Sequence, residues 1–201
     1  MKITEIRPQI KRTDRFSIFI DDKYSFSLSS KELLEAKLYV GLEISDIELV
    51  GFNKLAENSL VRAQCFRYLS YRLRSEWEME TYLKRKGYSP ELIKDTIDYF
   101  VARKLIDDQE FANRWIENRL LLKPTSINVL KQELKQKRVK GEVINQAVIE
   151  HNIDELQIIK QLIEKKRQQS KYQDDLKLMQ LLARKGFSYD HIKRSLNSAG
   201  D

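Results

Sequence analysis

The stretch LKRKGYSPELI at residues 83–93 returns as LARKGFSYDHI at residues 182–192, and a more divergent copy, LKQKRVKGEVI, occupies residues 134–144. In the first copy, Gly87 suits the left-handed conformation that is common just past a helix end. Ser89 and Pro90 then suit the N-cap and first position of a new helix. Each copy therefore predicts one helix that ends and another that begins, with a lysine held near the end of the first. The lysines in question are Lys86, Lys137 and Lys185.

The similarity extends beyond the quoted stretch into a longer repeat. Adding 51 to a residue number of the first copy gives the second copy, and adding 99 gives the third. The apolar positions that stay in phase are Met79/Leu130/Leu178, Leu83/Leu134/Leu182, Tyr88/Val139/Phe187, Ile93/Ile144/Ile192 and Ile97/Val148/Leu196. This agreement indicates an internal repeat of about fifty residues, each copy a three-helix unit. Units this small bury little core alone, so neighbouring copies are expected to stack as an elongated, curved array.

Residues 1–58 have a different pattern, in which apolar and polar residues alternate. FSIFIDDKYSFSL, residues 16–28, predicts a β-hairpin with its turn at Asp21-Asp22-Lys23. ITEIRPQI, residues 3–10, is a candidate third strand, and Pro8 restricts it to a sheet edge.

Two short helices are expected after this hairpin. The first follows Ser30 and ends near Gly41, and the second follows the capping-box pair Ser45 and Glu48. The predicted fold is therefore mainly α: three tandem, helix-turn-helix-like repeats preceded by a small hairpin-containing segment. The expected domain boundaries are 1–58 for the N-terminal segment and 59–106, 107–153 and 154–201 for the three repeats.

The charge of the chain is positive and unevenly distributed. The net charge is +7, but residues 1–58 carry nine Lys and Arg against ten Asp and Glu. The excess therefore belongs to the repeats, and it favours a polyanionic partner such as nucleic acid or an acidic protein surface. Cys65, the single cysteine, lies in an apolar helical stripe, so a core position is expected for it. No apolar run approaches the ~20 residues of a membrane span, and a cytoplasmic protein is expected.

The sequence offers little for catalysis. His151 and His191 lie in different repeats, and neither has a second His or a Cys at metal-ligand spacing. Asp107 and Asp108 suit a helix N-terminus, where the dipole favours negative charge. Phosphate-loop, G-x-S-x-G and H-E-x-x-H motifs do not occur. We therefore expect a binding protein with no catalytic residue, no metal site and no cofactor.

Basic residues near helix ends are the remaining candidates for function. For any one of them, stabilisation of the helix dipole is an equally good explanation, but dipoles do not require a net positive array. The candidate contact residues are Arg72, Arg74, Lys84, Arg85, Lys86, Arg114, Arg119, Lys123, Lys131, Lys135, Lys137, Arg184 and Lys185.

Several segments resemble the RecX family, whose members regulate the recombinase RecA. YLSYRLRSEWEMETYLKRKGYSPELI (68–93) is similar to the first-repeat signature of the family, and LIDDQEFANRWIENRL (105–120) to its Asp-Asp, Phe-Ala and Trp segment. LKQELKQKRV (130–139) and LLARKGFSYDHIKRSL (181–196) resemble the later repeats. Arg138 departs from the family pattern, which usually has Gly at this position.

The resemblance implies a non-enzymatic protein that binds the RecA–single-stranded DNA filament along its groove, and we expect the chain to be a monomer. It implies lower ATP hydrolysis, strand exchange and co-protease activity, and so regulation of recombination, DNA repair and the SOS response. Single- or double-stranded DNA is expected as a further ligand, and no membrane partner is expected. Two alternatives remain from the residues alone. One is a tandem helix-turn-helix protein whose main ligand is DNA, and the other is a scaffold for an unrelated acidic protein.

Overall fold

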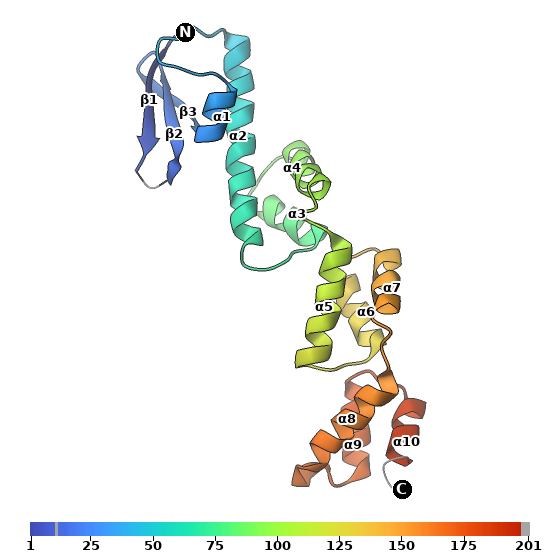
Figure 1. Cartoon of the computed structure of the whole chain (residues 1–201). Coiled ribbons are helices and arrows are strands. Elements are labelled where there is room, and N and C mark those ends of the chain that lie inside the picture. Colours follow the sequence, from blue (N-terminus) through green and yellow to red (C-terminus); the bar gives the residue numbers. More distant parts are fainter. Residues whose placement is uncertain (11, 198–201) are drawn as a thin grey trace. The chain divides into compact units, whose positions relative to one another are not determined.

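The structure is a computed structural model that describes residues 1–10 and 12–197 (Figure 1). These residues divide into two compact units, one of Met1–Arg72 with Ser89–Thr96 and one of Leu73–Tyr88 with the chain from Ile97 onward. Within the described residues, ten α-helices, one short 3₁₀ helix and one three-stranded sheet form. The prediction of a mainly helical protein with a small β element is confirmed.

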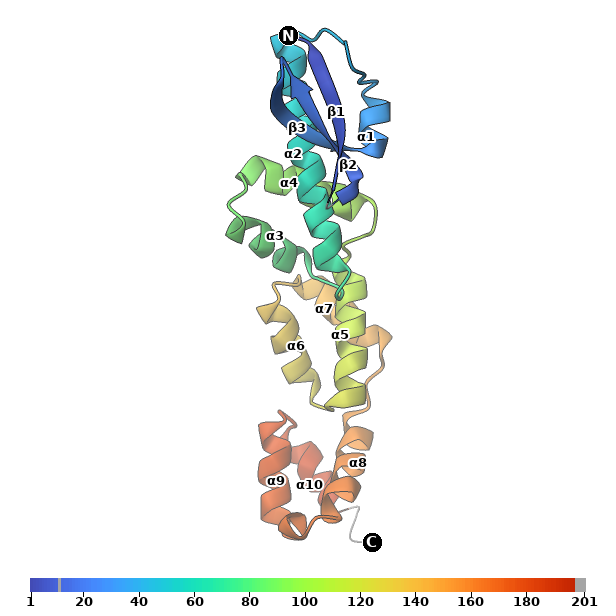
Figure 2. The same ribbon diagram turned by 90° about the vertical axis from the view of Figure 1, so that its left-hand side faces the viewer.

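The sheet of the first unit is antiparallel, in the order β1-β2-β3. Its strands are β1 (Ile3–Gln9), β2 (Arg12–Ile20) and β3 (Lys23–Ser29), which Figures 1 and 2 show from two sides. Pro8 pairs with Phe16 in β1, an edge strand, as its missing N–H requires. Asp21 and Asp22 form the β2–β3 turn with φ of 48° and 63°, the positive values of a type I′ hairpin turn. The third strand and the hairpin were therefore predicted correctly.

The helices that follow differ from the prediction. The first, α1 (Ser30–Glu35), is capped by Ser29 and ends well before Gly41. The second expected short helix has no independent end, because α2 runs without a break from Asp46 to Leu69. The Ser45–Glu48 capping box does begin α2, as predicted. One helix therefore carries the chain from the N-terminal segment into the first repeat.

The core of the first unit forms where the sheet meets these helices. Ile18 and Leu28 are fully buried, and Ala56 of α2 packs into the same cluster. Arg15 of β2 is 2% exposed. Its Nη1 donates to Ser59 Oγ of α2 at 2.7 Å, and its Nη2 donates to Ser27 O of β3 at 2.7 Å. A buried guanidinium thus joins two strands to α2.

The remaining helices belong to the repeats. In the first repeat α3 (Glu76–Arg85) and α4 (Pro90–Ala102) follow α2, and the division between the two units falls within α4. The second repeat consists of α5 (Asp108–Leu122), α6 (Ile127–Gln136) and α7 (Gly141–Glu150). The third repeat consists of α8 (Glu155–Arg167), the 3₁₀ turn η1 (Ser170–Tyr172), α9 (Asp175–Arg184) and α10 (Tyr189–Asn197).

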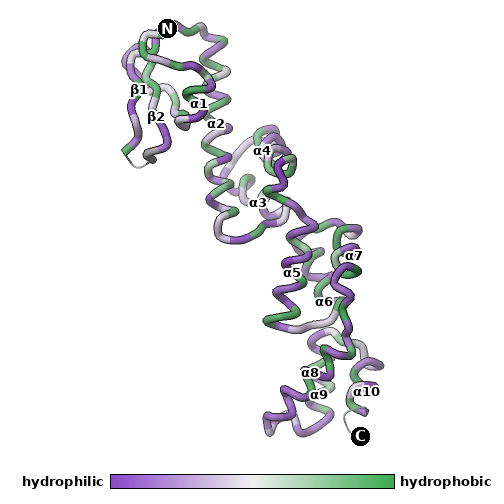
Figure 3. The backbone as a smooth tube through the Cα atoms, in the orientation of Figure 1, coloured by the Kyte–Doolittle hydropathy of each residue, from purple (hydrophilic) through white to green (hydrophobic). Residues whose placement is uncertain are grey.

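The second and third repeats have equivalent cores. Leu130, Leu134 and Ile144 are buried in one, and Leu178, Leu182 and Ile192 are buried at the same positions in the other. Of the fifteen predicted apolar side chains, only Tyr88 and Val148 fall outside the buried class, and both are half-buried. Figure 3 shows the corresponding alternation of hydrophobic and hydrophilic positions along each helix.

The turn that ends the second helix of each repeat has one geometry with three residues. Gly87 and Gly186 adopt φ of +82° and +84°. Arg138 occupies the same position in the second repeat with φ of +58°, although it has a Cβ. The substitution of Gly by Arg therefore leaves the left-handed turn in place, at the cost of backbone strain.

Replacing Arg138 with glycine is expected to raise the free energy of unfolding by about 1 kcal/mol, because glycine relieves the left-handed strain. Arg138 is exposed, so little side-chain packing is lost. Chemical denaturation followed by circular dichroism would measure the change. Arg138→Ala retains the strain and serves as the control, so an equal gain in both variants would contradict this explanation.

Candidate functional site

Two of the three repeated lysines, Lys137 and Lys185, lie where one repeat contacts the next. In the second unit, Ser75 caps α3 and its Oγ donates to the carbonyl of Lys137 at 3.1 Å. The N–H of Glu76, first in α3, donates to Asp108 Oδ1 at 2.9 Å. Asp108 is the first residue of α5. We call this contact of the first and second repeats the first junction, formed by Ser75, Glu76, Glu78, Asp108 and Lys137.

The second and third repeats meet through the same arrangement. Thr125 Oγ1 and the N–H of Ser126 donate to the carbonyl of Lys185 at 2.8 and 3.1 Å. The N–H of Ile127, first in α6, donates to Glu155 Oε1 at 2.6 Å. Glu155 is the first residue of α8, as Asp108 is of α5. We call this contact the second junction, formed by Pro124, Thr125, Ser126, Ile127, Val129, Glu155 and Lys185.

In both junctions, two groups of the following repeat accept hydrogen bonds from the N-terminal end of the second helix of the preceding repeat. They are the backbone carbonyl of the lysine and the side chain of an acidic residue that begins a helix. The repeated lysine position is therefore structural through its main chain. Burial raises the pKa of Asp108 above its usual value, an effect that outweighs its bond from Glu76 and the charge of Lys140.

The two junctions differ in what surrounds the lysine side chain. At the first, Lys137 Nζ lies 2.6 Å from Glu78 Oε1 and 5.4 Å from the centre of the Trp115 ring. The Glu78 side chain is only 7% exposed, so the pair is largely removed from water. The ammonium of Lys137 is thus compensated within the protein.

At the second junction the equivalent carboxylate is missing. Val129 occupies the position of Glu78 in the next repeat, and Lys185 Nζ donates to the carbonyl of Pro124 at 2.7 Å. The pKa of Lys185 is lowered by burial first, and then by the positive charges of Lys123, Lys166 and Arg119. The charge of Lys137 is therefore compensated by a carboxylate at the first junction, whereas the charge of the equivalent Lys185 has no such carboxylate among the described residues at the second.

The other candidates in the second repeat divide by their contacts. Arg119 binds Glu133 through Nε at 2.7 Å and through Nη2, and Trp115 Nε1 donates to the same carboxylate at 2.9 Å. The bond from Arg119, opposed by burial and aided by Trp115, holds the pKa of Glu133 below its usual value. Arg119 is therefore engaged within its own repeat.

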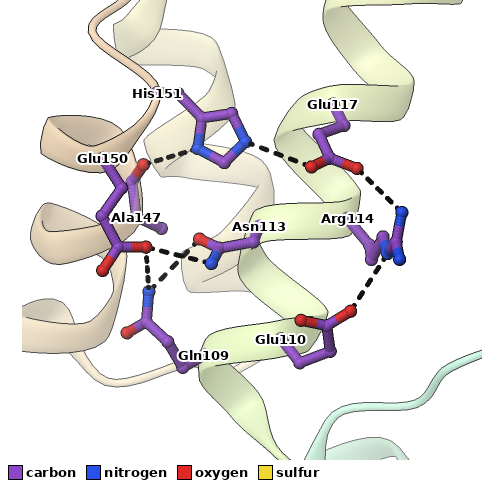
Figure 4. Close-up of polar contacts among 8 residues, drawn as sticks. All are labelled: Gln109, Glu110, Asn113, Arg114, Glu117, Ala147, Glu150 and His151. Atoms are coloured by element: carbon purple, nitrogen blue, oxygen red, sulfur yellow. Dashed lines mark hydrogen bonds and ion pairs between the residues drawn. The ribbon is translucent and has the colours of Figure 1, made fainter.

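Arg114 lies in a polar network between α5 and α7 (Figure 4). It contacts Glu110 at 3.0 Å and Glu117 at 3.2 Å, both on its own helix. Glu117 also faces His151, whose Nδ1 lies 2.8 Å from the carbonyl of Ala147. His151 is the C-cap of α7.

The remaining candidates lie on or near the surface. Lys84 pairs with Glu80 at 2.7 Å, Lys131 donates to Asn145 at 2.9 Å, and Arg184 donates to the carbonyl of Gln180 at 3.3 Å. Arg74 is half-buried. The exposed members of the set are Arg72, Lys84, Arg85, Lys86, Arg114, Lys123, Lys135 and Arg184.

Sequence reasoning missed two features of this surface. The first is Lys166 in the last turn of α8, whose charge acts on Lys185 together with that of Lys123. The basic run EKKR at residues 164–167 was the sequence signal that could have identified it. The second feature is Glu78, which was not among the candidates although its carboxylate binds Lys137 in the next repeat. No local signal identifies that partner.

Other kinds of site find little support. A cavity of about 650 Å³ in the first unit is lined by β3, α2 and the start of α4, and it contains none of the candidate residues. Among residues 1–10 and 12–197, no group of three His, Cys, Asp or Glu is placed to hold a metal ion. Cys65 is fully buried, and burial raises the pKa of its thiol to about 12, which leaves it unreactive. No helix in the described part of the chain is long and apolar enough to cross a membrane.

Comparison with known proteins gives one consistent result. Four family descriptions match in order: the RecX N-terminal domain at residues 1–45, and the first, second and third RecX three-helix domains at residues 62–100, 107–148 and 153–196. Regulatory protein RecX of Bacillus subtilis (strain 168) is 30% identical over 97% of this chain and 76% of its own length. The RecX of Geobacillus sp. (strain WCH70) is 32% identical over 99% of this chain and 77% of its own length.

Solved structures agree on the fold. A crystal structure of a regulatory protein RecX aligns over 98% of both chains with a TM-score of 0.74 at 23% identity. The crystal structure of RecX from Lactobacillus salivarius aligns over 70% of this chain and 95% of its own with a TM-score of 0.61 at 25% identity. With an N-terminal sheet, three three-helix repeats and relatives that match nearly its whole length, the chain belongs to the RecX family of regulatory proteins.

Proposed function

We propose that this chain is a non-enzymatic modulator of RecA. It binds the RecA–single-stranded DNA filament along its groove and lowers ATP hydrolysis, strand exchange and co-protease activity. Recombination and the SOS response are thereby held in check. The observation that carries this proposal is the match to all four RecX domains, in order and across the whole chain.

The charge of the repeats supports a role in binding a polyanionic assembly. Residues 59–201 hold 28 Lys and Arg against 20 Asp and Glu. Several of these cations, including Arg85, Lys86 and Lys135, are exposed at or near the ends of α3 and α6. Positive charge of this kind steers a protein toward a nucleoprotein surface, and repeated weak contacts multiply through effective concentration.

A triple charge reversal tests the proposal. Arg85→Glu, Lys86→Glu and Lys135→Glu together are expected to raise the concentration needed for half-inhibition of RecA ATPase at least about tenfold, or about 1.4 kcal/mol of binding. The measurement is steady-state ATP hydrolysis by RecA on single-stranded DNA, with the chain added in increasing amounts. All three side chains are exposed, so helical content by circular dichroism should be unchanged.

The matched control reverses three exposed lysines of the N-terminal segment, Lys23, Lys31 and Lys37. It makes the same change in net charge and should retain most of the inhibition. Equal loss in both triples would mean that total charge, not a surface of the repeats, governs binding. If the unmodified chain binds bare DNA tightly and leaves RecA unaffected, the chain is instead a DNA-binding protein and the proposal fails.

A further inference from the structure

The strongest uncompensated charge among the junctions lies at the second one. Lys123 is the C-cap of α5, Lys166 lies in the last turn of α8, and Lys185 is the C-cap of α9. Lys185 Nζ donates to the carbonyl of Pro124, the residue that follows Lys123. The charges of Lys123 and Lys166 both act on Lys185, so these lysines at three helix ends are neighbours. We call them the junction lysines.

The surrounding protein offsets only part of this charge. Across the described residues, the junction lysines form no ion pair with a carboxylate, and the nearby Glu133 is already bound by Arg119 and Trp115. Three helix C-termini contribute about −0.5 each, which leaves roughly half of the three positive charges uncompensated. At the first junction, by contrast, Glu78 neutralises Lys137.

The geometry points to the junction lysines as a phosphate-binding site that contacts the backbone of a nucleic acid. This inference rests on the proposed function, because it identifies the junction lysines as the site on the chain that contacts the DNA of the RecA filament. Ammonium groups bind phosphate as compact point charges, and they read no sequence. Lysine binds phosphate as a point charge, so a cluster of lysines can follow a phosphate chain without a bidentate arginine contact.

Neighbouring residues extend the same surface. Lys166 Nζ and Lys171 Nζ lie 5.5 and 5.6 Å from the centre of the Tyr172 ring, on which both side chains are held. Lys165 and Lys166 are consecutive in the last turn of α8. Cations at several neighbouring positions suit a polyanion with many phosphates better than a single small anion.

The salt dependence of binding tests this assignment directly. The full chain is titrated onto a fluorescein-labelled oligo(dT) strand at several salt concentrations between about 50 and 200 mM. Lys123→Gln with Lys166→Gln is expected to reduce the slope of log K against log salt by about 1.4, because each phosphate contact on a single strand contributes ~0.7. Lys31→Gln with Lys37→Gln, which removes equal charge from the exposed N-terminal segment, should leave the slope unchanged.

A second variant uses the difference between the junctions. Val129→Glu places at the second junction the carboxylate that Glu78 supplies at the first. Added to the two lysine substitutions, it is expected to reduce the slope by about a further 0.7, because it neutralises Lys185. Val129→Gln has nearly the same shape without the charge and should not change the slope. A change of slope that is the same for both substitutions would overturn the role of Lys185.

Measuring RecA ATPase inhibition on the same variants separates this inference from the proposed function. An unchanged slope with intact inhibition overturns the phosphate site and leaves the proposed function standing. A reduced slope with no RecA effect from the unmodified chain supports the site and refutes the function. Leu121 and Leu122, 79% and 78% exposed beside Lys123, provide the last arm. Leu121→Gln with Leu122→Gln is compared with the double lysine variant in both measurements. If both variants lose inhibition of RecA while the salt slope stays constant, the site binds an acidic protein segment and the inference is wrong.

Discussion

Replacing Gly186 with alanine is expected to destabilise the repeats by about 3 kcal/mol, far more than the same change at Gly87. Both glycines have nearly the same left-handed φ, so the backbone strain of alanine, about 1 kcal/mol, is common to the two. The space around them differs. A Cβ at Gly186 would lie 2.4 Å from Val129 Cγ2 and 2.5 Å from Ser126 Oγ, whereas a Cβ at Gly87 meets nothing within 4 Å.

The additional cost at Gly186 arises at the second junction. Ser126 is fully buried and caps α6, and its N–H binds the carbonyl of Lys185. Relief of the clash must move the cap or the turn, and overpacking of this kind costs about 1–3 kcal/mol. The third repeat should therefore lose protection from hydrogen exchange in Gly186→Ala before the second repeat does.

Chemical denaturation of both variants, followed by circular dichroism, measures the difference. Gly87→Ala is the matched control, because it isolates the strain from the steric contact. Equal losses of stability in the two variants would show that the second junction is not closely packed at Gly186. A loss in Gly186→Ala without loss of protection in the third repeat would place the damage elsewhere.

The periodic features of this fold could be predicted from the sequence because they depend on local chemistry. Gly87, Ser89 and Pro90 mark a helix end and start through backbone constraints that act within a few residues. The in-phase apolar positions Leu134 and Leu182 are buried because each belongs to the core cluster of its own three-helix unit. Arg138 is consistent with this local control, since its turn keeps a positive φ although the residue is not glycine.

Features that depend on distant partners could not be predicted. The α2 helix runs from Asp46 to Leu69 with no end near residue 58, and Ser59 within it donates to Glu32 Oε2 at 2.6 Å, a partner that lies 27 residues away. The roles of the repeated lysines depend on whether Glu78 or Val129 faces them, and Glu78 lies 59 residues from Lys137. Pattern alone nominated Lys86, Lys137 and Lys185 equally, whereas their surroundings make them different.

Replacing Arg15 with methionine is expected to destabilise the N-terminal unit by about 3 kcal/mol, because it removes a buried cation and leaves its partners unsatisfied. Arg15 donates to Ser59 and Ser27, and Ser59 in turn donates to Glu32. Methionine fills much of the same volume but supplies no donor, so the loss measures the polar network and not a cavity. Arg7→Met, on an exposed arginine paired with Glu5, should change stability by less than ~0.5 kcal/mol.

The same network predicts a dependence on pH. Burial opposes the ionisation of Glu32, but the bonds from Ser59 and Ser29 and the charge of Arg15 more than offset it, so its pKa lies below the ordinary value of 4.5. A depressed pKa contributes stability above pH 4.5 that is lost as the pH falls through the folded-state pKa. Arg15→Met should therefore weaken this acid dependence as well as the stability itself.

Hydrogen exchange of the β1, β2 and β3 amides is the suitable measurement, because Trp77 and Trp115, the two tryptophans of the chain, report on the repeats instead. The sheet amides of Arg15→Met should exchange faster than those of Arg7→Met at neutral pH, and the difference should shrink as the pH falls below 4.5. If sheet protection is unchanged in Arg15→Met, the buried guanidinium does not hold the sheet to α2. In that case the apolar cluster around Ile18, Leu28 and Ala56 carries the stability of the N-terminal unit without it.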